Sequence, residues 1–266
     1  MIDFSDHTVV VRGGGDIGSG IIWRLRRVGF PVVVLELERP LTIRRTVAYS
    51  TAVTAGSIVI DGIEGRRVDS ANAAMAAASH RVVPVLVSPG IPDMPISVVI
   101  DARLAKRNLG TAIDHASLVV ALGPGFMAGE DCHAVVETMR GHDLGRVIWS
   151  GSAAANTGVP GLIGGASGDR VLHAGQDGAL SWDVTYGDVV ERGQILGHVG
   201  GSAIRSRIDG MVRGLLLPGS VVKGLKIADI DPRVDPAAIH HISDKALSVG
   251  GGVLEAILVW LNDAAR

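Results

Sequence analysis

The sequence is poor in aromatic residues and has a single cysteine. Only 3% of its 266 residues are Phe, Trp or Tyr, which argues against a stacking platform for single-stranded nucleic acid. One cysteine, Cys132, excludes an intrachain disulfide framework and a multi-cysteine zinc site. No apolar run approaches the ~18 residues that span a bilayer, and the first residues do not resemble a secretion signal. We therefore expect a cytoplasmic protein with no membrane span.

Neither sign of charge dominates the chain. It has 25 basic and 27 acidic residues and a net charge of −2, so no basic field exists to hold a nucleic-acid backbone, and we expect no nucleic-acid partner. Glycine is abundant instead, with 36 residues against the ~7% of ordinary proteins. These glycines form short clusters between apolar runs. Such clusters indicate tight turns and close approach of the backbone to a ligand.

The first part of the chain alternates between buried strands and helices. Apolar runs predict strands at 8–12, 32–37, 82–87, 98–101, 118–122 and 146–149, and helical spacing predicts helices at 19–28, 71–79 and 133–139. Polar alternation around Asp61 and Gly62 predicts a β-hairpin insertion at about 44–68. The alternation predicts an α/β fold, a Rossmann-like doubly wound parallel sheet.

The pattern of alternating strands and helices ends after residue 150. Short β runs with glycine turns at 180–222 resemble half of a biotinyl/lipoyl-type barrel, but the turn at 200–205 has no lysine for covalent attachment. A helical tail follows from Asp244 to Leu261. We expect a Rossmann-like nucleotide- or cofactor-binding domain at 1–165, a small β-barrel-like module at 166–234 and a C-terminal helical segment at 235–266.

The strongest motif is Gly13-x-Gly15-x-x-Gly18, between a predicted strand and a predicted helix. Glycines there allow a tight turn and close approach to a pyrophosphate, which the helix N-terminus attracts. Glu36 ends the next strand and would accept from a ribose hydroxyl; Glu38 is the alternative. The competing interpretation is a glycine-rich turn needed only for packing. The predicted cofactor-binding turn consists of Arg12, Gly13, Gly14, Gly15, Asp16, Ile17 and Gly18.

Two further segments are predicted to bind the same ligand. A glycine-containing loop follows the strand at 118–122, and ligands of open α/β sheets bind beyond the carboxyl ends of the strands. An arginine pair follows the second strand, and arginine can grip phosphate with two parallel bonds. The alternatives are an ordinary strand-to-helix turn and a solvated charge pair. The residues are Gly123, Pro124, Gly125 and Phe126 in the loop, and Arg44 and Arg45 in the pair.

Cys132 is the candidate catalytic residue. We expect it in the first turn of a helix, where the helix dipole lowers a thiol pKa, although Asp131 would raise it. The alternative is a small residue that packs the helix onto the sheet. His240 and His241 are adjacent, so their side chains point in different directions on a helix, and neither has an acid or a cysteine at ligand spacing. We therefore expect no metal site.

Longer motifs extend over nearly the whole chain. They include Arg-Gly-Gly-Gly-Asp-Ile at 12–17, Asp-Ile-Asp-Pro-Arg at 229–233 and Gly-Gly-Gly-Val-Leu-Glu-Ala at 250–256, with others at 36–47, 123–126, 131–138, 140–146 and 242–245. Together they resemble the YqeB-type proteins, which are described as accessory proteins of selenium-dependent molybdenum hydroxylases and look related to the XdhC/CoxI maturation factors.

The resemblance implies a role in molybdenum hydroxylase maturation. The chain would bind a small phosphorylated ligand, either a molybdopterin-type cofactor or a nucleotide, and assist its sulfur or selenium modification or its delivery. Its partners would be an apo-molybdenum hydroxylase and a sulfur/selenium donor protein, and we expect a homo-oligomer. The alternative is an NAD(P)-dependent oxidoreductase, but no Tyr-x-x-x-Lys or paired His/Asp arrangement supplies its proton donor. The residues leave open whether the chain is an enzyme.

Overall fold

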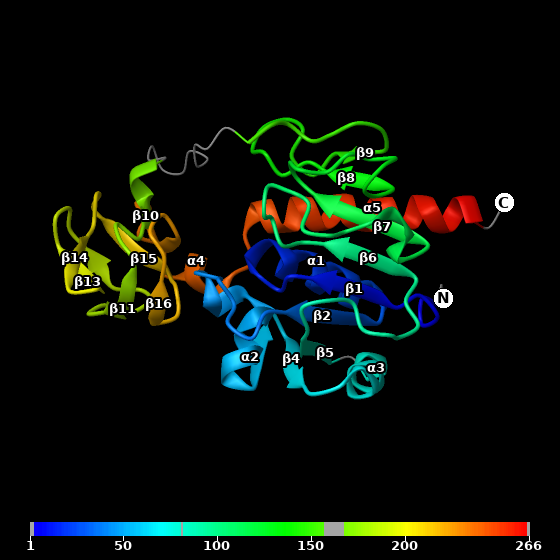
Figure 1. Cartoon of the computed structure of the whole chain (residues 1–266), viewed down its shortest axis with the longest axis horizontal. Coiled ribbons are helices and arrows are strands. Elements are labelled where there is room, and N and C mark those ends of the chain that lie inside the picture. The colour runs from blue at the N-terminus through cyan, green and yellow to red at the C-terminus, as the bar shows by residue number, and fades with distance from the viewer. Residues whose placement is uncertain (1–2, 81, 157–167, 265–266) are drawn as a thin grey trace. The chain divides into compact units, whose positions relative to one another are not determined.

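The computed structural model describes residues 3–80, 82–156 and 168–264. The chain forms two compact units (Figure 1). The first, which we call the α/β unit, contains Met1–Pro40, Val47–Asn156 and Ile242–Arg266. The second, the β unit, contains Leu41–Thr46 and Thr157–His241. The chain therefore leaves the α/β unit twice and returns to it for the last helix. The boundary expected at 165/166 lies outside the described residues.

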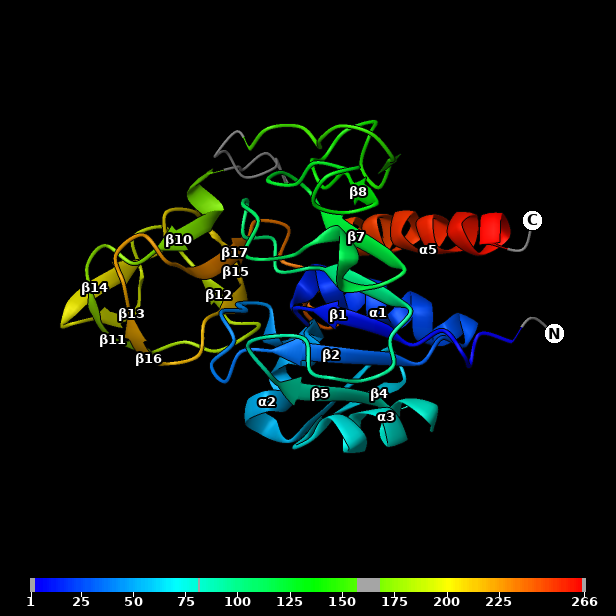
Figure 2. The same cartoon turned by 45° about the vertical axis from the view of Figure 1, so that its right-hand side comes forward.

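The described part of the α/β unit is built on a nine-stranded mixed sheet, in the order β3-β4-β5-β2-β1-β6-β7-β8-β9. Neighbours from β4 to β8 are parallel, whereas β3 and β9 run antiparallel to the strands beside them. Figure 2 shows β1, β2 and β5 side by side at its centre. The strands are β1 (Val9–Arg12), β2 (Val32–Glu36), β3 (Ser57–Ile60), β4 (Ile63–Val68), β5 (Val83–Val87), β6 (Val98–Asp101), β7 (Leu118–Leu122), β8 (Ala134–Val136) and β9 (Val147–Ile148).

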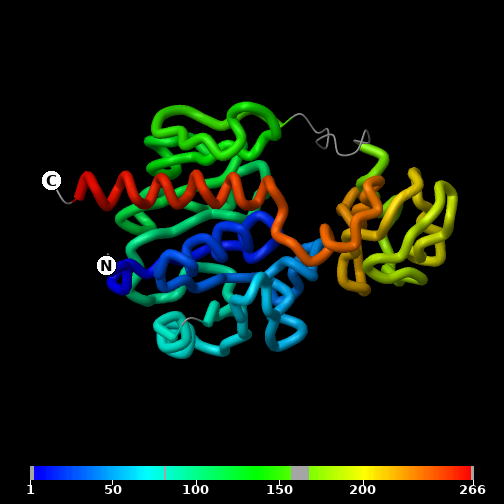
Figure 3. Tube along the Cα trace, turned by 180° about the vertical axis from the view of Figure 1, so that it is seen from behind, coloured from blue at the N-terminus to red at the C-terminus, as the bar shows by residue number. Residues whose placement is uncertain are grey.

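The central strands are continuous aliphatic runs because both faces of the sheet are covered. Val9 and Val11 pack with helices α1 (Asp16–Val28) and α5 (Asp244–Ala264) on one face. Val10 points to the other face, where helix α3 (Ala71–Ser79) and the loop after β7 lie. Figure 3 shows α1 and α5 together on their face. The sheet is thus the middle of three layers. Shorter elements are α2 (Ala52–Ala55), η1 (Arg45–Val47), η2 (Tyr49–Thr51) and η3 (Ile113–His115).

Helices α1 and α5 approach closely because small residues face each other. A Cβ on Gly20 would lie 2.6 Å from the carbonyl oxygen of Ala246, and one on Gly250 would lie 2.9 Å from that of Gly20. A Cβ on Gly252 would overlap the carbonyl oxygen of Gly145, in the turn before β9. The glycine cluster in the last helix therefore allows close packing, and the helix continues through it.

The described part of the β unit consists of two four-stranded antiparallel sheets, in the orders β10-β17-β15-β12 and β14-β13-β11-β16. Their aliphatic side chains form one core, which Ile43 joins from the segment Leu41–Thr46. The strands are β10 (Val171–His173), β11 (Gly178–Trp182), β12 (Val189–Val190), β13 (Ile195–Val199), β14 (Ser202–Arg205), β15 (Gly210–Leu215), β16 (Gly219–Val221) and β17 (Lys226–Asp231); η4 (Gly168–Arg170) precedes them and α4 (Ala237–His240) follows them.

The predicted fold class is wrong. A Rossmann-like parallel sheet with a biotinyl/lipoyl-like module and a separate C-terminal helix was expected, but the sheet is mixed, the β unit has two complete antiparallel sheets, and α5 packs within the α/β unit. The physical reason is the length of the links. The link from β8 to β9 is only residues 137–146, and the amide of Glu137 donates to the carbonyl of Arg146 across it, whereas a parallel return needs a crossover of a dozen or more residues.

Two predicted elements also differ locally. The helix expected at 133–139 is strand β8, because its Ala-Val-Val core pairs in parallel with β7. The expected edge hairpin is present but shorter: β3 and β4 pair around Asp61 and Gly62, which both have positive φ. Residues 45–55 form short helices instead of a strand. The remaining strands of the α/β unit, α3 and α5 lie close to where they were predicted.

The glycine cluster of α5 yields a direct test of close packing. Gly252→Ala should lower the free energy of unfolding by about 1–3 kcal/mol, because its methyl group meets backbone that cannot move aside. Gly251→Ala is the matched control: nothing lies within 4 Å of its Cβ position, and alanine should raise stability by ~0.5–1 kcal/mol in a helix. Urea unfolding measures both. Equal effects of the two substitutions would contradict the packing.

Candidate anion-binding site

A glycine-rich turn joins β1 to α1 at the carboxyl edge of the parallel strands. Gly13 has φ +104°, a conformation that favours glycine, and its amide donates to the carbonyl of Leu35 at 2.9 Å. A Cβ on Gly18 would overlap the carbonyl oxygen of Gly13. Helix α1 begins after Gly15, which supplies no side-chain cap. The predicted turn is present, and close packing of backbone explains the need for glycine at Gly13 and Gly18.

The residues of the turn differ in exposure. Those on its outer side are half-buried, and the others contact the sheet or the core. Gly13, Gly15 and Asp16 are half-buried, whereas Arg12, Gly14, Ile17 and Gly18 are buried. A ligand can therefore reach only the outer part of the turn directly.

Glu36 holds the turn from the inside. Its Oε1 accepts from the amide of Gly14 at 2.6 Å, and its Oε2 accepts from the amide of Leu37 at 2.9 Å. The side chain is buried, and this burial raises the pKa of Glu36 above its usual value although the two amide bonds act to lower it. The structure thus places Glu36 beside the turn, as predicted, but with both oxygen atoms already accepting from the backbone.

A segment from the loop after β2 lies over the same side of the turn. The amide of Ser50 donates to the carbonyl of Gly14 at 2.9 Å, and the amide of Tyr49 donates to the hydroxyl of Ser19 at 2.9 Å. A Cβ on Gly14 would lie 2.9 Å from Val34 and 3.0 Å from the Ser50 amide. The β2 side of the turn is therefore covered by protein.

A charged cluster occupies the other side, where β1 and β6 end next to each other. Arg12 and Asp101 are register partners at these two strand ends. Arg103 forms two bonds with Asp101, at 3.1 Å from Nε and 2.5 Å from Nη2. The hydroxyl of Thr111 donates to Oδ2 of Asp101 at 2.7 Å and accepts from Nη1 of Arg12 at 2.7 Å. We call Arg12, Asp101, Arg103 and Thr111 the arginine cluster.

The arginine cluster has one positive charge in excess. Arg12 is only 7% exposed, and its hydrogen bonds go to neutral groups, the hydroxyl of Thr111 and the carbonyl of Gly110. Burial lowers the pKa of Arg12 and the charge of Arg103 lowers it further, which outweighs the charge of Asp101 that acts to raise it. Burial acts to raise the pKa of Asp101, but the bonds from Arg103 and Thr111 and the charge of Arg103 outweigh it and hold that pKa below its usual value. Asp101 is therefore ionised, and both of its charged side-chain hydrogen bonds come from Arg103.

The loop after β6 is held against the loop after β7. A Cβ on Gly125 would lie 2.6 Å from the backbone nitrogen of Arg107, so the two chains touch there. The amide group of Asn108 donates to Asp131 at 3.0 Å, and Asp131 also accepts from the amide of Met127 at 2.8 Å. Lys106 has φ +61°, a strained conformation for a residue other than glycine. The loop carries the exposed side chains of Lys106 and Arg107.

The predicted loop at 123–126 thus borders the site mainly through its backbone. Gly123 is buried, and a Cβ there would overlap the hydroxyl of Thr138. Pro124 is half-buried, Gly125 is exposed, and Phe126 belongs to the core that covers the α3 face of the sheet.

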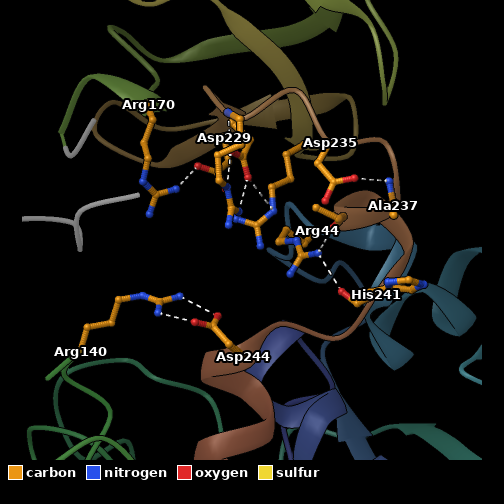
Figure 4. Close-up of polar contacts among 12 residues, drawn as sticks. Arg44, Arg140, Arg170, Asp229, Asp235, Ala237, His241 and Asp244 are labelled. Atoms are coloured by element: carbon orange, nitrogen blue, oxygen red, sulfur yellow. Dashed lines mark hydrogen bonds and ion pairs between the residues drawn. The ribbon is translucent and has the colours of Figure 1, made fainter. Parts of the chain in front are cut away.

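Arg44 and Arg45 belong to the β unit, not to the α/β unit that contains the turn. Nη2 of Arg44 donates to the carbonyl oxygens of Ala238 and His241 at 2.8 and 3.2 Å (Figure 4). Nε of Arg45 donates to the hydroxyl of Tyr186 at 3.0 Å and to the carbonyl of Leu215 at 3.1 Å. These bonds anchor the segment Leu41–Thr46 to the β unit.

The Asp-Ile-Asp-Pro-Arg motif at 229–233 also has a structural role. Asp229 pairs with Arg170, and Arg233 forms two bonds with Asp231 at 2.9 and 2.6 Å. Arg213 on the neighbouring strand lies 3.6 Å from both carboxylates. The motif therefore connects β17 with β15 and with the start of β10.

Cys132 is fully buried and does not lie in a helix. Its expected place in a first helical turn is wrong, because strand β8 begins two residues later, at Ala134. Burial, with a further contribution from the charge of Asp131, raises the pKa of Cys132 to about 12. The thiolate is therefore strongly disfavoured near neutral pH.

Five residues of the site were not predicted from the sequence: Asp101, Arg103, Lys106, Arg107 and Thr111. A signal was present, because the predicted strand at 98–101 ends in an acid and the next six residues carry three basic side chains. The partnership with Arg12 was not visible, since it depends on β6 lying next to β1.

The described residues form neither a metal centre nor a membrane-spanning helix. Among residues 3–80, 82–156 and 168–264, no group of three or more His, Cys, Asp or Glu side chains is placed to hold a metal ion. In the same part of the chain, no helix is long and apolar enough to cross a membrane.

Comparison with solved structures gives only remote likenesses. A product-bound ectoine utilization protein EutE (DoeB) from Ruegeria pomeroyi is 14% identical, with a TM-score of 0.25 over 84% of this chain and 56% of that one. An aspartoacylase family protein from Mesorhizobium loti is 11% identical, with a TM-score of 0.28 over 84% of each chain. Likenesses this weak support no inference about function. No family model matches the sequence.

Comparison with curated proteins gives a strong match. The chain is 46% identical, over 262 residues and 97% of its length, to "Uncharacterized protein YqeB" of Escherichia coli (strain K12). It spans 48% of that protein, so it corresponds to about half of the relative. The chain therefore belongs to the YqeB-type proteins that its motifs resemble.

Proposed function

We propose that this chain is an accessory factor in the maturation of a molybdenum hydroxylase, in particular a selenium-dependent one. In this role the α/β unit binds a molybdopterin-type cofactor or a nucleotide through a phosphate group and delivers it to the apo-hydroxylase. The observation that carries the proposal is the arginine cluster beside the glycine turn, with its excess of one buried positive charge.

A buried guanidinium with neutral partners is energetically unfavourable, because burial removes the water that solvates the charge. Arg12 is in this situation, since Asp101 forms its ionic bonds with Arg103. An anionic group bound next to the cluster would compensate the charge. Guanidinium groups and backbone N–H groups at a helix start are the donors that bind phosphate. The donor set of this site therefore fits the phosphate of either ligand.

Delivery rather than covalent transfer is the role that suits this chain. Cys132 is the single thiol, and it is buried with a raised pKa. In the proposed function, the arginine cluster and the outer turn hold the phosphate, and the exposed loop after β6 covers it. The metal chemistry belongs to the cofactor, and sulfur or selenium comes from the donor protein.

Gly15→Val tests the place of the ligand. Gly15 has φ −68°, which valine can adopt, so the substitution adds bulk at the half-buried outer turn without backbone strain. We expect at least a tenfold loss of phosphate-ligand affinity in calorimetry and loss of hydroxylase activity in cells that produce only the variant. Gly175→Val is the control in the β unit, with no atom within 4 Å of its Cβ position. Wild-type affinity in the Gly15 variant would place the ligand elsewhere.

Cys132 permits a test of delivery against covalent transfer. A pKa of about 12 instead of 9.0 leaves a thiolate fraction about a thousandfold smaller at pH 8. The native protein should therefore resist iodoacetamide at pH 8, whereas the urea-unfolded chain, with the same thiol exposed, should react within minutes. Cys132→Ala should still support maturation of the hydroxylase. Rapid labelling of the native protein, together with loss of maturation in the variant, would refute a delivery role.

A further inference from the structure

We infer that the site recognises a terminal phosphate that arrives from the β6 side of the turn, and that it does not read a ribose. The ligand class is then a phosphomonoester, such as a phosphorylated pterin or a nucleoside monophosphate, and not a dinucleotide without a terminal phosphate, such as NAD. This inference rests on the proposed function and narrows it.

The β2 side of the turn offers no place for a ribose. In the predicted dinucleotide mode, the acid at the end of β2 accepts from a ribose hydroxyl. Here both oxygen atoms of Glu36 accept backbone amides, and the side chain is only 9% exposed. Tyr49 and Ser50 are bonded across the same side of the turn. A ribose would have to displace this segment to reach the buried carboxylate of Glu36.

The β6 side differs in charge. Gly13 packs against backbone there too, with its Cβ position 3.1 Å from Ala102, but this side carries the basic side chains of the site. The side chain of Arg12 reaches to Thr111 on the same side, and Arg103 is 23% exposed there. Lys106 and Arg107 are exposed on the connecting loop. A ligand from this direction meets cations before it meets the turn.

The charge of the site favours a dianion. Asp101 neutralises one of the two guanidinium groups in the arginine cluster, and Lys106 adds a further positive charge on the loop. A terminal phosphate carries a charge of about −1.5 to −2 at pH 7, whereas each phosphate within a diester carries one.

The test compares probes that differ in one feature each. Calorimetry is performed on the full chain with AMP, phenyl phosphate, diphenyl phosphate and NAD. AMP and phenyl phosphate should bind with similar affinity, because the ribose is not read. Diphenyl phosphate and NAD should bind at least about tenfold more weakly, because each lacks a terminal dianion.

Variants locate the binding. Arg12→Gln should weaken AMP binding by about tenfold or more. Lys106→Gln, at an exposed position, should weaken it severalfold without affecting folding, which thermal unfolding checks. Arg66→Gln is the matched control, since that arginine is exposed and pairs with Glu64 on β4; it should bind like the wild type.

Each outcome is decisive. Equal binding of NAD and AMP, with a selective loss of NAD binding in Glu36→Gln, would overturn the inference and leave the proposed phosphate site intact. Binding of no probe, or binding that is unaffected by both Arg12→Gln and Lys106→Gln, would overturn the proposed site as well.

Discussion

The carboxylate of Asp101 is the group on which the site depends. It is 1% exposed and accepts from Arg103 and Thr111, and Thr111 in turn accepts from Arg12. Through these bonds the ends of β1 and β6 and the loop after β6 form one unit. Loss of this carboxylate would leave two guanidinium groups close together in a buried place, which is strongly destabilising. Asp101 therefore stabilises both the strand end that precedes the glycine turn and the loop after β6.

Close backbone contacts position the surrounding loops. Gly13 lies against the exit of β6, and Gly125 lies against Arg107. On the face of the sheet that α1 and α5 cover, Gly20 allows α1 to approach Ala246 of α5, and Gly252 allows α5 to approach Gly145. Most of these contacts involve backbone on both sides, so they leave little freedom for adjustment. Close contacts thus account for part of the glycine content, and other glycines, such as Gly29 and Gly62, have open space and a positive φ.

The arginine side chains of the β unit and Arg12 of the α/β unit have different kinds of partner. In the β unit, arginine and aspartate side chains pair with each other or with carbonyl oxygens and connect strands, as in Arg233 with Asp231. In the α/β unit, Arg12 has only neutral hydrogen-bond partners among its observed contacts. Arginine is structural in both units, as in Arg140 with Asp244, and the proposed anion site rests on Arg12 alone having neutral hydrogen-bond partners in its cluster. The difference follows from the partners that the fold supplies.

Much of the local structure followed from the sequence alone. Aliphatic runs located the central strands, the Asp61-Gly62 pair located the edge turn, and the glycine motif located the turn before α1. The motifs also identified the YqeB-type proteins. The tertiary structure decided the rest, because strand direction, the order of the sheet and the partners of a charge are long-range properties. Glu36 lies where it was predicted, beside the turn. Only the fold showed that its two carboxylate oxygens accept hydrogen bonds from the amides of Gly14 and Leu37. Arg12 and Asp101 are far apart in the chain and meet only because β1 and β6 are neighbours.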